Sequence, residues 1–269
     1  MKLYGLIGET LTHSLSPQLH KEIYLRTGIQ AAYKNFPLPS DKVPHAIESL
    51  RILSISGSNV TIPYKEAVMP YLDAIDPTAE KLGVVNTILN TDGYLEGYNT
   101  DYEGFGLLFK RRHWDLTGAH VTVLGTGGSS KMVVQYVRDH GAEAITLVSR
   151  TPNTSLGDGL LKYKTYEELS ELEGDYLINT TPVGMYPNMT ESPVDQETVS
   201  HFGACIDLIY NPLETVLLRQ AKELGKPVAN GLEMLIGQAI KSVEIWEGRL
   251  LPEHLMDELM SDYDQWKKG

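Results

Sequence analysis

Four short polar segments of the chain carry the side chains best suited to acid–base chemistry and to binding a small polar ligand. They lie at residues 14–16, 59–65, 84–87 and 99–101, each beside a strand-like run. Lysine and aspartate can hold and transfer a proton, while serine, threonine and asparagine can bind carboxylate and hydroxyl groups. Because loops at the carboxyl ends of parallel strands meet at one crevice, we expect the segments to face one ligand. Taken alone, each segment is also explained by a helix cap, a strand-end turn or a solvated charge.

A glycine-rich turn follows the apolar run at residues 120–124 and precedes a helix-period stretch. The turn consists of Gly125, Thr126, Gly127, Gly128 and Ser129. Glycine lets backbone N–H groups approach a pyrophosphate at a helix N-terminus. The third glycine of the dinucleotide fingerprint is replaced by Ser130, and any α/β protein can carry a glycine-rich turn. The turn alone therefore indicates a dinucleotide site only weakly.

The next strand-like run, at residues 144–148, adds information about the cofactor. It is followed by Ser149, Arg150 and Thr151, and no carboxylate occurs before Asp158. An acidic residue at this place binds the ribose hydroxyls of NAD, whereas arginine meets the 2′-phosphate of NADP. The pattern favours NADP over NAD, with a solvated surface arginine as the alternative.

Composition limits the partners of the protein. The 269 residues carry a formal net charge of −12, which disfavours nucleic acid and anionic membrane surfaces. No apolar run reaches the roughly 18–20 residues of a membrane helix. The eight histidines form no metal-spaced pair, and we predict no metal site. The single cysteine, Cys205, fits a reducing compartment, so we expect a cytoplasmic protein in which it is a small buried residue.

Short apolar runs alternate with helix-period stretches, which predicts an α/β fold with parallel sheets. Strands are expected at residues 3–7, 32–36, 57–60, 86–90, 94–98, 120–124, 144–148, 176–179, 204–209 and 227–229, with a hairpin turn at residues 91–93. Helices are expected to open at a Ser16 cap followed by Pro17, and at residues 41–53, 102–112, 130–139, 232–246 and 252–266.

The polar segments, taken together with three later ones, resemble the shikimate dehydrogenase family along nearly the whole chain. The motifs occur in the family's order: Ser14-Leu15-Ser16-Pro17, Asn59-Val60-Thr61-Ile62-Pro63-Tyr64-Lys65, Gly83-Val84-Val85-Asn86-Thr87, Gly97-Tyr98-Asn99-Thr100-Asp101, Asn179-Thr180-Thr181-Pro182-Val183-Gly184-Met185, Asp207-Leu208-Ile209-Tyr210-Asn211-Pro212 and a segment at residues 231–239.

The resemblance implies a two-lobed architecture. An α/β substrate-binding domain would occupy residues 1–100, with residues 235–269 packing back on it, and a Rossmann-like NADP-binding domain would occupy residues 101–234. The implied activity is the reversible NADPH-dependent reduction of 3-dehydroshikimate to shikimate, in a monomer or homodimer. The alternatives are a quinate/shikimate dehydrogenase and a non-catalytic protein that senses shikimate or quinate. Intact Lys65 and Asp101 count against the sensor.

The resemblance also implies roles for individual residues. Lys65 would be the general acid and base, and Asp101 would hold its amine. The substrate would be bound through its carboxylate by Ser14 and Ser16, and through its ring oxygens by Thr61, Asn86, Tyr210 and Gln238. The nicotinamide would lie near Leu208 and Gly231, the phosphates on the glycine turn, and the 2′-phosphate on Ser149, Arg150 and Thr151.

The chain departs from the family's pattern in its cofactor motifs. Ser149 stands where asparagine is usual, and Thr154 where a further basic residue is expected. These departures imply a weaker hold on the 2′-phosphate and leave open some use of NAD. Thr126 stands where a small residue such as alanine is usual, and we expect it to crowd the pyrophosphate slightly.

Overall fold

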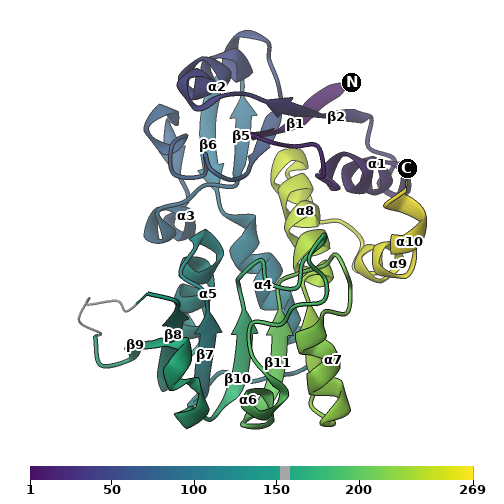
Figure 1. Ribbon diagram of the computed structural model, residues 1–269. Helices are drawn as coiled ribbons and strands as arrows, with labels where there is room; N and C mark the ends of the chain where they lie inside the picture. Colours follow the sequence, from purple (N-terminus) through teal and green to yellow (C-terminus); the bar gives the residue numbers. More distant parts are fainter. Residues whose placement is uncertain (152–157, 269) are drawn as a thin grey trace. The chain divides into compact units, whose positions relative to one another are not determined.

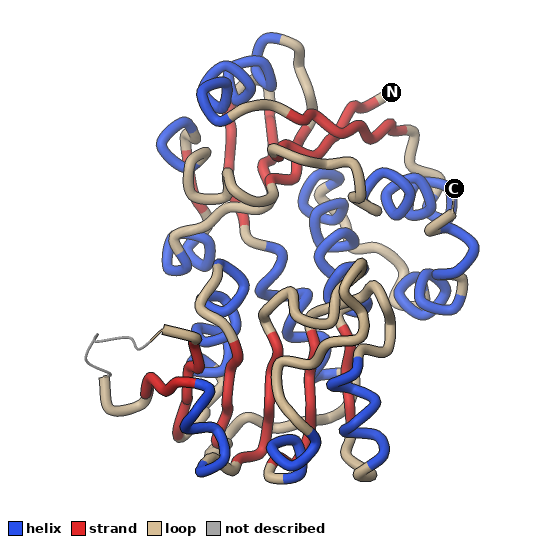
Figure 2. Tube along the Cα trace, in the orientation of Figure 1, coloured by secondary structure: helices blue, strands red, loops and turns tan. Residues whose placement is uncertain are grey.

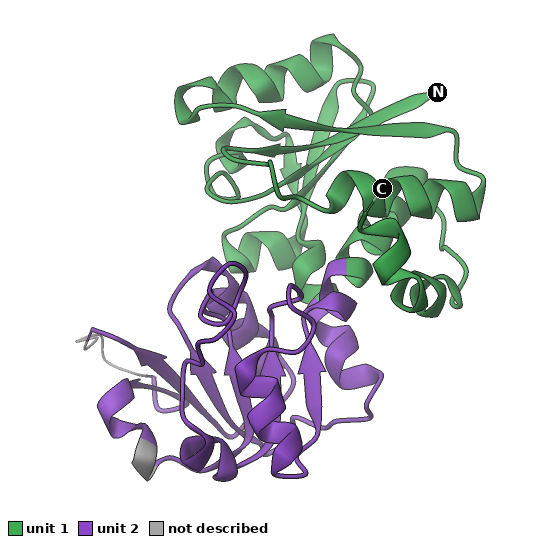
Figure 3. Cartoon of the chain, turned by 45° about the vertical axis from the view of Figure 1, so that its right-hand side comes forward, with its two compact units in different colours: residues 1–104, 236–269 green, residues 105–235 purple. Residues whose placement is uncertain are grey.

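The structure is a computed structural model that describes residues 1–151 and 158–268. The chain divides into two compact units, coloured separately in Figure 3. Unit 1 comprises Met1–Gly104 and Ile236–Gly269, and unit 2 comprises Phe105–Leu235. Helices and strands alternate along most of the trace (Figure 2). The predicted α/β fold is therefore confirmed, as is the return of the C-terminal helices to the first part of the chain.

Unit 1 is built on a six-stranded sheet with the order β2-β1-β3-β5-β6-β4 (Figure 1). The strands are β1 (Lys2–Gly8), β2 (Ala31–Pro37), β3 (Gly57–Val60), β4 (Ala74–Ile75), β5 (Thr87–Thr91) and β6 (Tyr94–Tyr98). β1, β2 and β3 are parallel, whereas β5 runs antiparallel to both β3 and β6. The sheet is thus mixed and not purely parallel, and β1, β3 and β6 end at the edge where β5 begins.

The mixed sheet follows from the predicted hairpin between β5 and β6. Asp92 and Gly93 both have positive φ, 53° and 92°, as a tight turn between antiparallel strands requires. Because β5 runs in the opposite direction to β3 and β6, its start lies at the edge where those two strands end. The loop after β3, residues 84–87 and residues 99–101 therefore lie at the same edge. This edge carries the polar segments of unit 1.

Helices cover the sheet of unit 1, including three from the end of the chain. They are α1 (Ser16–Thr27), α2 (Val43–Ile52), α3 (Pro77–Leu82), the start of α4 (Thr100–Lys110), most of α8 (Leu232–Glu247), α9 (Leu255–Ser261) and α10 (Tyr263–Trp266), with short 3-10 turns η1 (Ser40–Lys42) and η2 (Met69–Tyr71). Trp246 of α8 stacks on Tyr4 of β1 at 4.4 Å and donates from Nε1 to the Ile88 carbonyl. At Gly57 a Cβ atom would lie 2.4 Å from Nε1 of Trp246, so glycine leaves room for this ring.

Unit 2 contains a six-stranded sheet with the order β12-β11-β10-β7-β8-β9, in which every pair of neighbours is parallel. The strands are β7 (His120–Leu124), β8 (Ala144–Ser149), β9 (Leu161–Thr165), β10 (Gly174–Asn179), β11 (Phe202–Asp207) and β12 (Val228–Asn230). The helices are α5 (Gly128–Asp139), α6 (Gln196–Ser200) and α7 (Val216–Glu223), with the 3-10 turn η3 (Tyr166–Glu171). The last four residues of β7, β10 and β11 are buried, as in a parallel sheet covered on both faces. Cys205 on β11 is buried, as predicted.

Two local predictions were wrong. Ser16 does not cap α1; it is the first helical residue, and its N–H donates to Ser14 Oγ at 3.2 Å. The helix expected at residues 252–266 begins only at Leu255 and is divided at Asp262, whose carboxylate accepts a hydrogen bond from Arg26 of α1. None of the helices in the described ranges is long and apolar enough to cross a membrane.

Candidate active site

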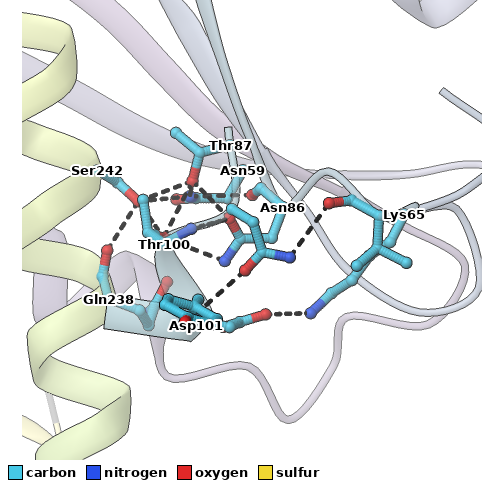
Figure 4. Close-up of polar contacts among 11 residues, drawn as sticks. Asn59, Lys65, Asn86, Thr87, Thr100, Asp101, Gln238 and Ser242 are labelled. Atoms are coloured by element: carbon cyan, nitrogen blue, oxygen red, sulfur yellow. Dashed lines mark hydrogen bonds and ion pairs between the residues drawn. The ribbon is translucent and has the colours of Figure 1, made fainter. Parts of the chain in front are cut away.

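Lys65 and Asp101 form an ion pair at the polar edge of the unit 1 sheet (Figure 4). Lys65 Nζ lies 2.5 Å from Asp101 Oδ2, and the two side chains are 27% and 18% exposed. The pair is therefore sheltered and still within reach of a small ligand. Asp101 lies in the first turn of α4, where the helix dipole favours a negative charge.

The backbone on either side of Lys65 is fixed by the core. Tyr64 is 2% exposed and donates from its hydroxyl to the Leu38 carbonyl at 2.7 Å. The Lys65 carbonyl accepts a hydrogen bond from the Val85 N–H at 2.9 Å. A long lysine side chain loses considerable freedom when it is ordered. The ion pair with Asp101 orders this side chain before a ligand binds, so less of that cost falls on ligand binding.

Asn86 links the start of β5 to the start of α4. Its side chain is buried, its Oδ1 accepts from the Thr100 N–H at 2.7 Å, and its Nδ2 donates to Thr100 Oγ1 at 3.0 Å. One of the four free N–H groups at the N-terminus of α4 is thereby satisfied. Asn86 therefore holds the first turn of α4, on which Asp101 lies.

A buried polar cluster supports this arrangement from behind. We define it as Asn59, Thr87, Thr100 and Ser242, which come from β3, β5, α4 and α8 (Figure 4). Asn59 Nδ2 lies 3.0 Å from Thr87 Oγ1 and 2.9 Å from Ser242 Oγ. Ser242 Oγ also lies 2.9 Å from Thr87 Oγ1 and 3.1 Å from Thr100 Oγ1, and it donates to the Gln238 carbonyl at 2.8 Å. The cluster joins four elements of unit 1.

The cluster extends toward the residues predicted to bind a carboxylate. Tyr33 of β2 donates from its hydroxyl to Asn59 Oδ1 at 2.8 Å, and the Ser16 side chain hydrogen-bonds the same phenol. Burial raises the pKa of Tyr33 well above its ordinary value, so the phenol stays neutral. Stacked on Tyr33 at 4.0 Å is the buried ring of His20, whose pKa burial lowers to about 3. His20 is thus a neutral packing residue at physiological pH.

The structure places the other predicted substrate residues in both units. Ser14 and Thr61 follow β1 and β3 at the polar edge, and the Thr61 N–H donates to the Ile7 carbonyl. Gln238 lies in α8, one helical turn before Ser242, and its carbonyl accepts from that serine. Tyr210 lies in unit 2, in the loop after β11.

Unit 2 contains a cavity of about 530 Å³ beside the glycine turn. Its lining residues are Gly125, Thr126, Gly127, Ser149, Arg150, Tyr166, Thr180, Thr181, Pro182, Val183, Ser192 and Pro193. Gly125 has φ 101°, a conformation that side chains other than glycine rarely adopt. At Gly127 and Gly128 a Cβ atom would meet nothing within 4 Å, so a ligand can approach the backbone closely.

The first turn of α5 lies at one end of this cavity. Its N-cap, Gly127, is in the extended region, and within the described part of the chain no side chain caps the helix. N–H groups at such a helix start bind phosphate oxygens well. The residues present therefore fit the diphosphate of a dinucleotide.

Ser149 and Arg150 line the same cavity, next to Tyr166. Ser149 Oγ donates to the Thr151 carbonyl at 2.5 Å, and Arg150 and Thr151 are exposed. Burial raises the pKa of Tyr166, and the nearby positive charge of Arg150 opposes that shift. An exposed guanidinium beside a ring fits an adenosine that carries a phosphate. Thr154 lies outside the described residues.

Behind the cavity lies a buried carboxylate for which the sequence suggested no role. Asp207, the last residue of β11, is fully buried, and burial raises its pKa to about 6. It accepts hydrogen bonds from Asn179, Ile209 and Thr215. The only signal in the sequence was its place in the segment that begins with Asp207 and ends with Pro212.

The fold and these two sites define a class: a two-unit α/β oxidoreductase whose unit 2 has a cavity that fits a dinucleotide and whose unit 1 carries a lysine–aspartate pair. Among the described residues, no group of His, Cys, Asp or Glu is arranged to hold a metal ion. Residues 6–88 match the family described as the shikimate dehydrogenase substrate binding domain. Residues 231–260 match the shikimate 5'-dehydrogenase C-terminal domain.

Relatives extend this match over the whole chain. A shikimate dehydrogenase (NADP(+)) of Clostridium beijerinckii is 47% identical over 266 residues, 98% of each chain. The crystal structure of shikimate dehydrogenase 1 from Peptoclostridium difficile is 42% identical, covers 100% of both chains and has a TM-score of 0.90. A Thermus thermophilus shikimate 5-dehydrogenase in complex with NADP(H) and shikimate is 33% identical, with a TM-score of 0.85, over 96% of this chain and 98% of that one. The chain belongs to the shikimate dehydrogenase family.

Proposed function

We propose that the protein catalyses the reversible NADPH-dependent reduction of 3-dehydroshikimate to shikimate. The observation that carries this proposal is the contact of Lys65 Nζ with Asp101 Oδ2 at a sheltered but accessible edge. The curated relatives of this chain carry the same activity in their names, with NADP as cofactor. A shikimate dehydrogenase needs a group that exchanges a proton with the reacting oxygen, and Lys65 supplies one.

Proton transfer is assigned to Lys65. When bound, NADPH supplies the hydride to the carbonyl carbon. The Lys65 ammonium gives its proton to the carbonyl oxygen as negative charge develops there, and in the reverse direction the amine takes the hydroxyl proton. Asp101 holds Nζ in place and accepts a hydrogen bond from the same hydroxyl. The short contact between the two residues fixes the donor before the substrate arrives.

The substrate is held by polar groups at the same edge of unit 1. Ser14 and Ser16 bind its carboxylate beside the start of α1, where the helix dipole favours an anion. Thr61 and Asn86 bind ring oxygens, and we assign the second N–H of the Asn86 amide to the ligand because its first is used by Thr100. Tyr210 and Gln238 are assigned to the remaining ring oxygens.

The cofactor is assigned to unit 2. Gly125, Thr126, Gly127, Gly128 and Ser129 hold the diphosphate at the start of α5, which no side chain of the described residues caps.

The two ends of the cofactor are assigned to other loops of unit 2. Ser149, Arg150 and Thr151 hold the 2′-phosphate at one end. Leu208 and Gly231 lie beside the nicotinamide at the other. The N–H of Gly231 donates to the Ile209 carbonyl, which joins the two loops at that end.

Two further assignments concern the setting of the enzyme. We place it in the cytoplasm, because its one cysteine is buried and has no second cysteine with which to form a disulfide within the chain. We assign no nucleic-acid or membrane partner, because the net charge of −12 repels phosphate-rich surfaces. The active species is a monomer or a homodimer.

Steady-state assays with shikimate and quinate, each against NADP⁺ and NAD⁺, test the proposed function. We expect the highest kcat/KM for shikimate with NADP⁺. Higher efficiency with quinate would reassign the substrate, and the absence of turnover with both substrates would reject the proposal.

The role of Lys65 is tested by Lys65→Ala, which should lower kcat by about 10²–10⁴-fold with a much smaller change in KM. The matched control is Lys42→Ala, which removes the exposed lysine of the Lys42–Asp41 ion pair and should leave kcat unchanged. Near-normal turnover of Lys65→Ala would remove Lys65 from the mechanism.

A further inference from the structure

Asp207 is a buried carboxylate whose hydrogen-bond partners, within the ranges that the structure describes, are uncharged donors and not a cation. Its Oδ1 accepts from Asn179 Nδ2 at 3.0 Å and from the Ile209 N–H at 3.1 Å, and its Oδ2 accepts from Thr215 Oγ1 at 2.7 Å. Burying a carboxylate without a cation is a costly way to add stability. The effect of these three hydrogen bonds is to fix the positions of the groups that donate them.

The carboxylate ties together the loops that follow two neighbouring strands. Asn179, the last residue of β10, accepts on Oδ1 from the N–H and the hydroxyl of Thr181, at 3.0 and 2.7 Å. The Leu208 N–H donates to the Asn179 carbonyl at 3.1 Å. Asp207 thus fixes the amide of Asn179 on one side and the Ile209 backbone on the other.

The first of these loops lines the cavity, and the proposed function places the second beside the nicotinamide. Thr181 and Val183 line the cavity beside the glycine turn, and Thr180 donates through its N–H and its hydroxyl to the Leu124 carbonyl, where β7 ends. The loop after β11 begins with Leu208, which the proposed function places beside the nicotinamide. One buried side chain therefore sets two walls of the site.

We propose that Asp207 is a positioning residue for NADP: its carboxylate fixes the loops at residues 180–183 and 208–212 and so sets cofactor affinity without touching the cofactor. The inference rests on the proposed function, because it assumes that the cofactor occupies the unit 2 cavity.

Substitutions at Asp207 can distinguish the role of its hydrogen bonds from the role of its charge. In Asp207→Asn the amide oxygen can keep the bonds from Asn179 and Ile209. The new N–H can donate to Thr215 Oγ1 once that hydroxyl rotates. The hydrogen bonds then survive while the charge is lost. Asp207→Ala removes all three bonds, and Asp207→Ser keeps a hydroxyl too short to meet three donors.

The test measures Kd for NADPH by fluorescence titration and amide hydrogen exchange in the unliganded protein. We expect Asp207→Ala to raise Kd by about 10- to 100-fold, as misplaced binding groups do, and Asp207→Asn to stay close to wild type. The amides of Thr181 and Ile209 should exchange faster in Asp207→Ala only. Asp195→Ala is the control: it removes the aspartate that caps α6 in the same unit and should leave Kd unchanged.

Each outcome decides the matter. A wild-type Kd for NADPH in Asp207→Ala would overturn the proposal. An equal rise of Kd in the Asn and Ala variants would also overturn it, because the charge and not the hydrogen-bond geometry would then be responsible. If Asp207→Ala does not fold, Asp207→Ser replaces it with the same expectation. The hydrogen-exchange measurement needs no cofactor, so it tests the role of Asp207 in holding the loops by itself. Failure of the wild-type protein to bind NADPH would reject the proposed cofactor site and not the role of Asp207 in the loops.

Discussion

Replacing Ser242 with alanine should weaken unit 1 and loosen the site that α8 helps to build. Ser242 Oγ has four polar neighbours between 2.8 and 3.1 Å, but one hydroxyl donates once and accepts twice. When it is removed, Thr87 and Thr100 can rotate their hydroxyls toward Asn86 Oδ1, at 3.0 and 3.2 Å. The Gln238 carbonyl keeps its bond within the helix.

Asn59 is the neighbour that cannot recover fully. Its amide keeps Thr87 Oγ1 at 3.0 Å, and its second N–H is left with the Asn86 carbonyl at 3.3 Å. One buried donor is thus poorly satisfied, which costs about 1–3 kcal/mol of unfolding free energy. Because Gln238 lies one turn before Ser242 on α8, KM for shikimate should rise while the pH profile of kcat stays as in wild type.

The assay is urea unfolding followed by tryptophan fluorescence, together with steady-state kinetics. Ser49→Ala is the matched control, because Ser49 also donates to the carbonyl four residues earlier in a helix, that of His45, but at the surface. Both variants gain the same helix propensity, so the difference between them isolates the buried cluster. Equal unfolding free energies for Ser242→Ala and Ser49→Ala would refute the reasoning.

Three more outcomes are expected. The pKa of Asp207 is raised from 3.8 to about 6 in the folded protein, so the stability contributed by its neutral form is complete below about pH 4 and lost as the pH rises through 6. The asparagine of Asp207→Asn does not titrate, so this variant does not lose that stability. The difference in unfolding free energy between the variant and wild type should therefore shift in favour of the variant by up to about 3 kcal/mol between pH 4 and 7, as measured by denaturant titrations. Arg150→Ala should weaken the binding of NADPH by roughly 10- to 100-fold in equilibrium titrations, because one charge-assisted contact is lost. The binding of NADH should weaken far less, and equal losses for the two cofactors would contradict the role of Arg150 in phosphate binding. Gly125→Ala would place a Cβ atom 2.9 Å from both Thr180 and Thr181, at a φ of 101° that alanine rarely adopts. We therefore expect the unfolding free energy to fall by about 1–3 kcal/mol in thermal unfolding. An unchanged unfolding midpoint would contradict the need for glycine in this turn.

The sheet and the polar edge were predictable because their signals are local. The strands at residues 57–60, 94–98 and 120–124 have the bounds predicted for them, since turn-forming residues lie on both sides of each strand. The polar segments reach one edge of unit 1 because β5 is reversed by a hairpin whose turn residues are visible in the sequence.

The break at Asp262 and the polar cluster were not predictable, because both depend on distant partners. Leu255, Leu259 and Tyr263 keep one apolar face across the break, so periodicity alone continues the helix. Thr87 and Ser242 are 155 residues apart, and a helical serine looks the same in the sequence whether it faces solvent or the core. The pair of Lys65 and Asp101 was expected only through the family resemblance, since nothing local joins residues 36 positions apart.

The return of α8 to unit 1 has a consequence for synthesis of the protein. Trp246, which lies in the space left by Gly57 and stacks on Tyr4, is translated only after the whole of residues 105–235. Until then the first hundred residues emerge without the ring that completes their core, while all of residues 105–235 are already available to fold. The part of the enzyme translated first is thus the part completed last, and a nascent chain stalled before Trp246 would present an unfinished apolar surface to chaperones and proteases.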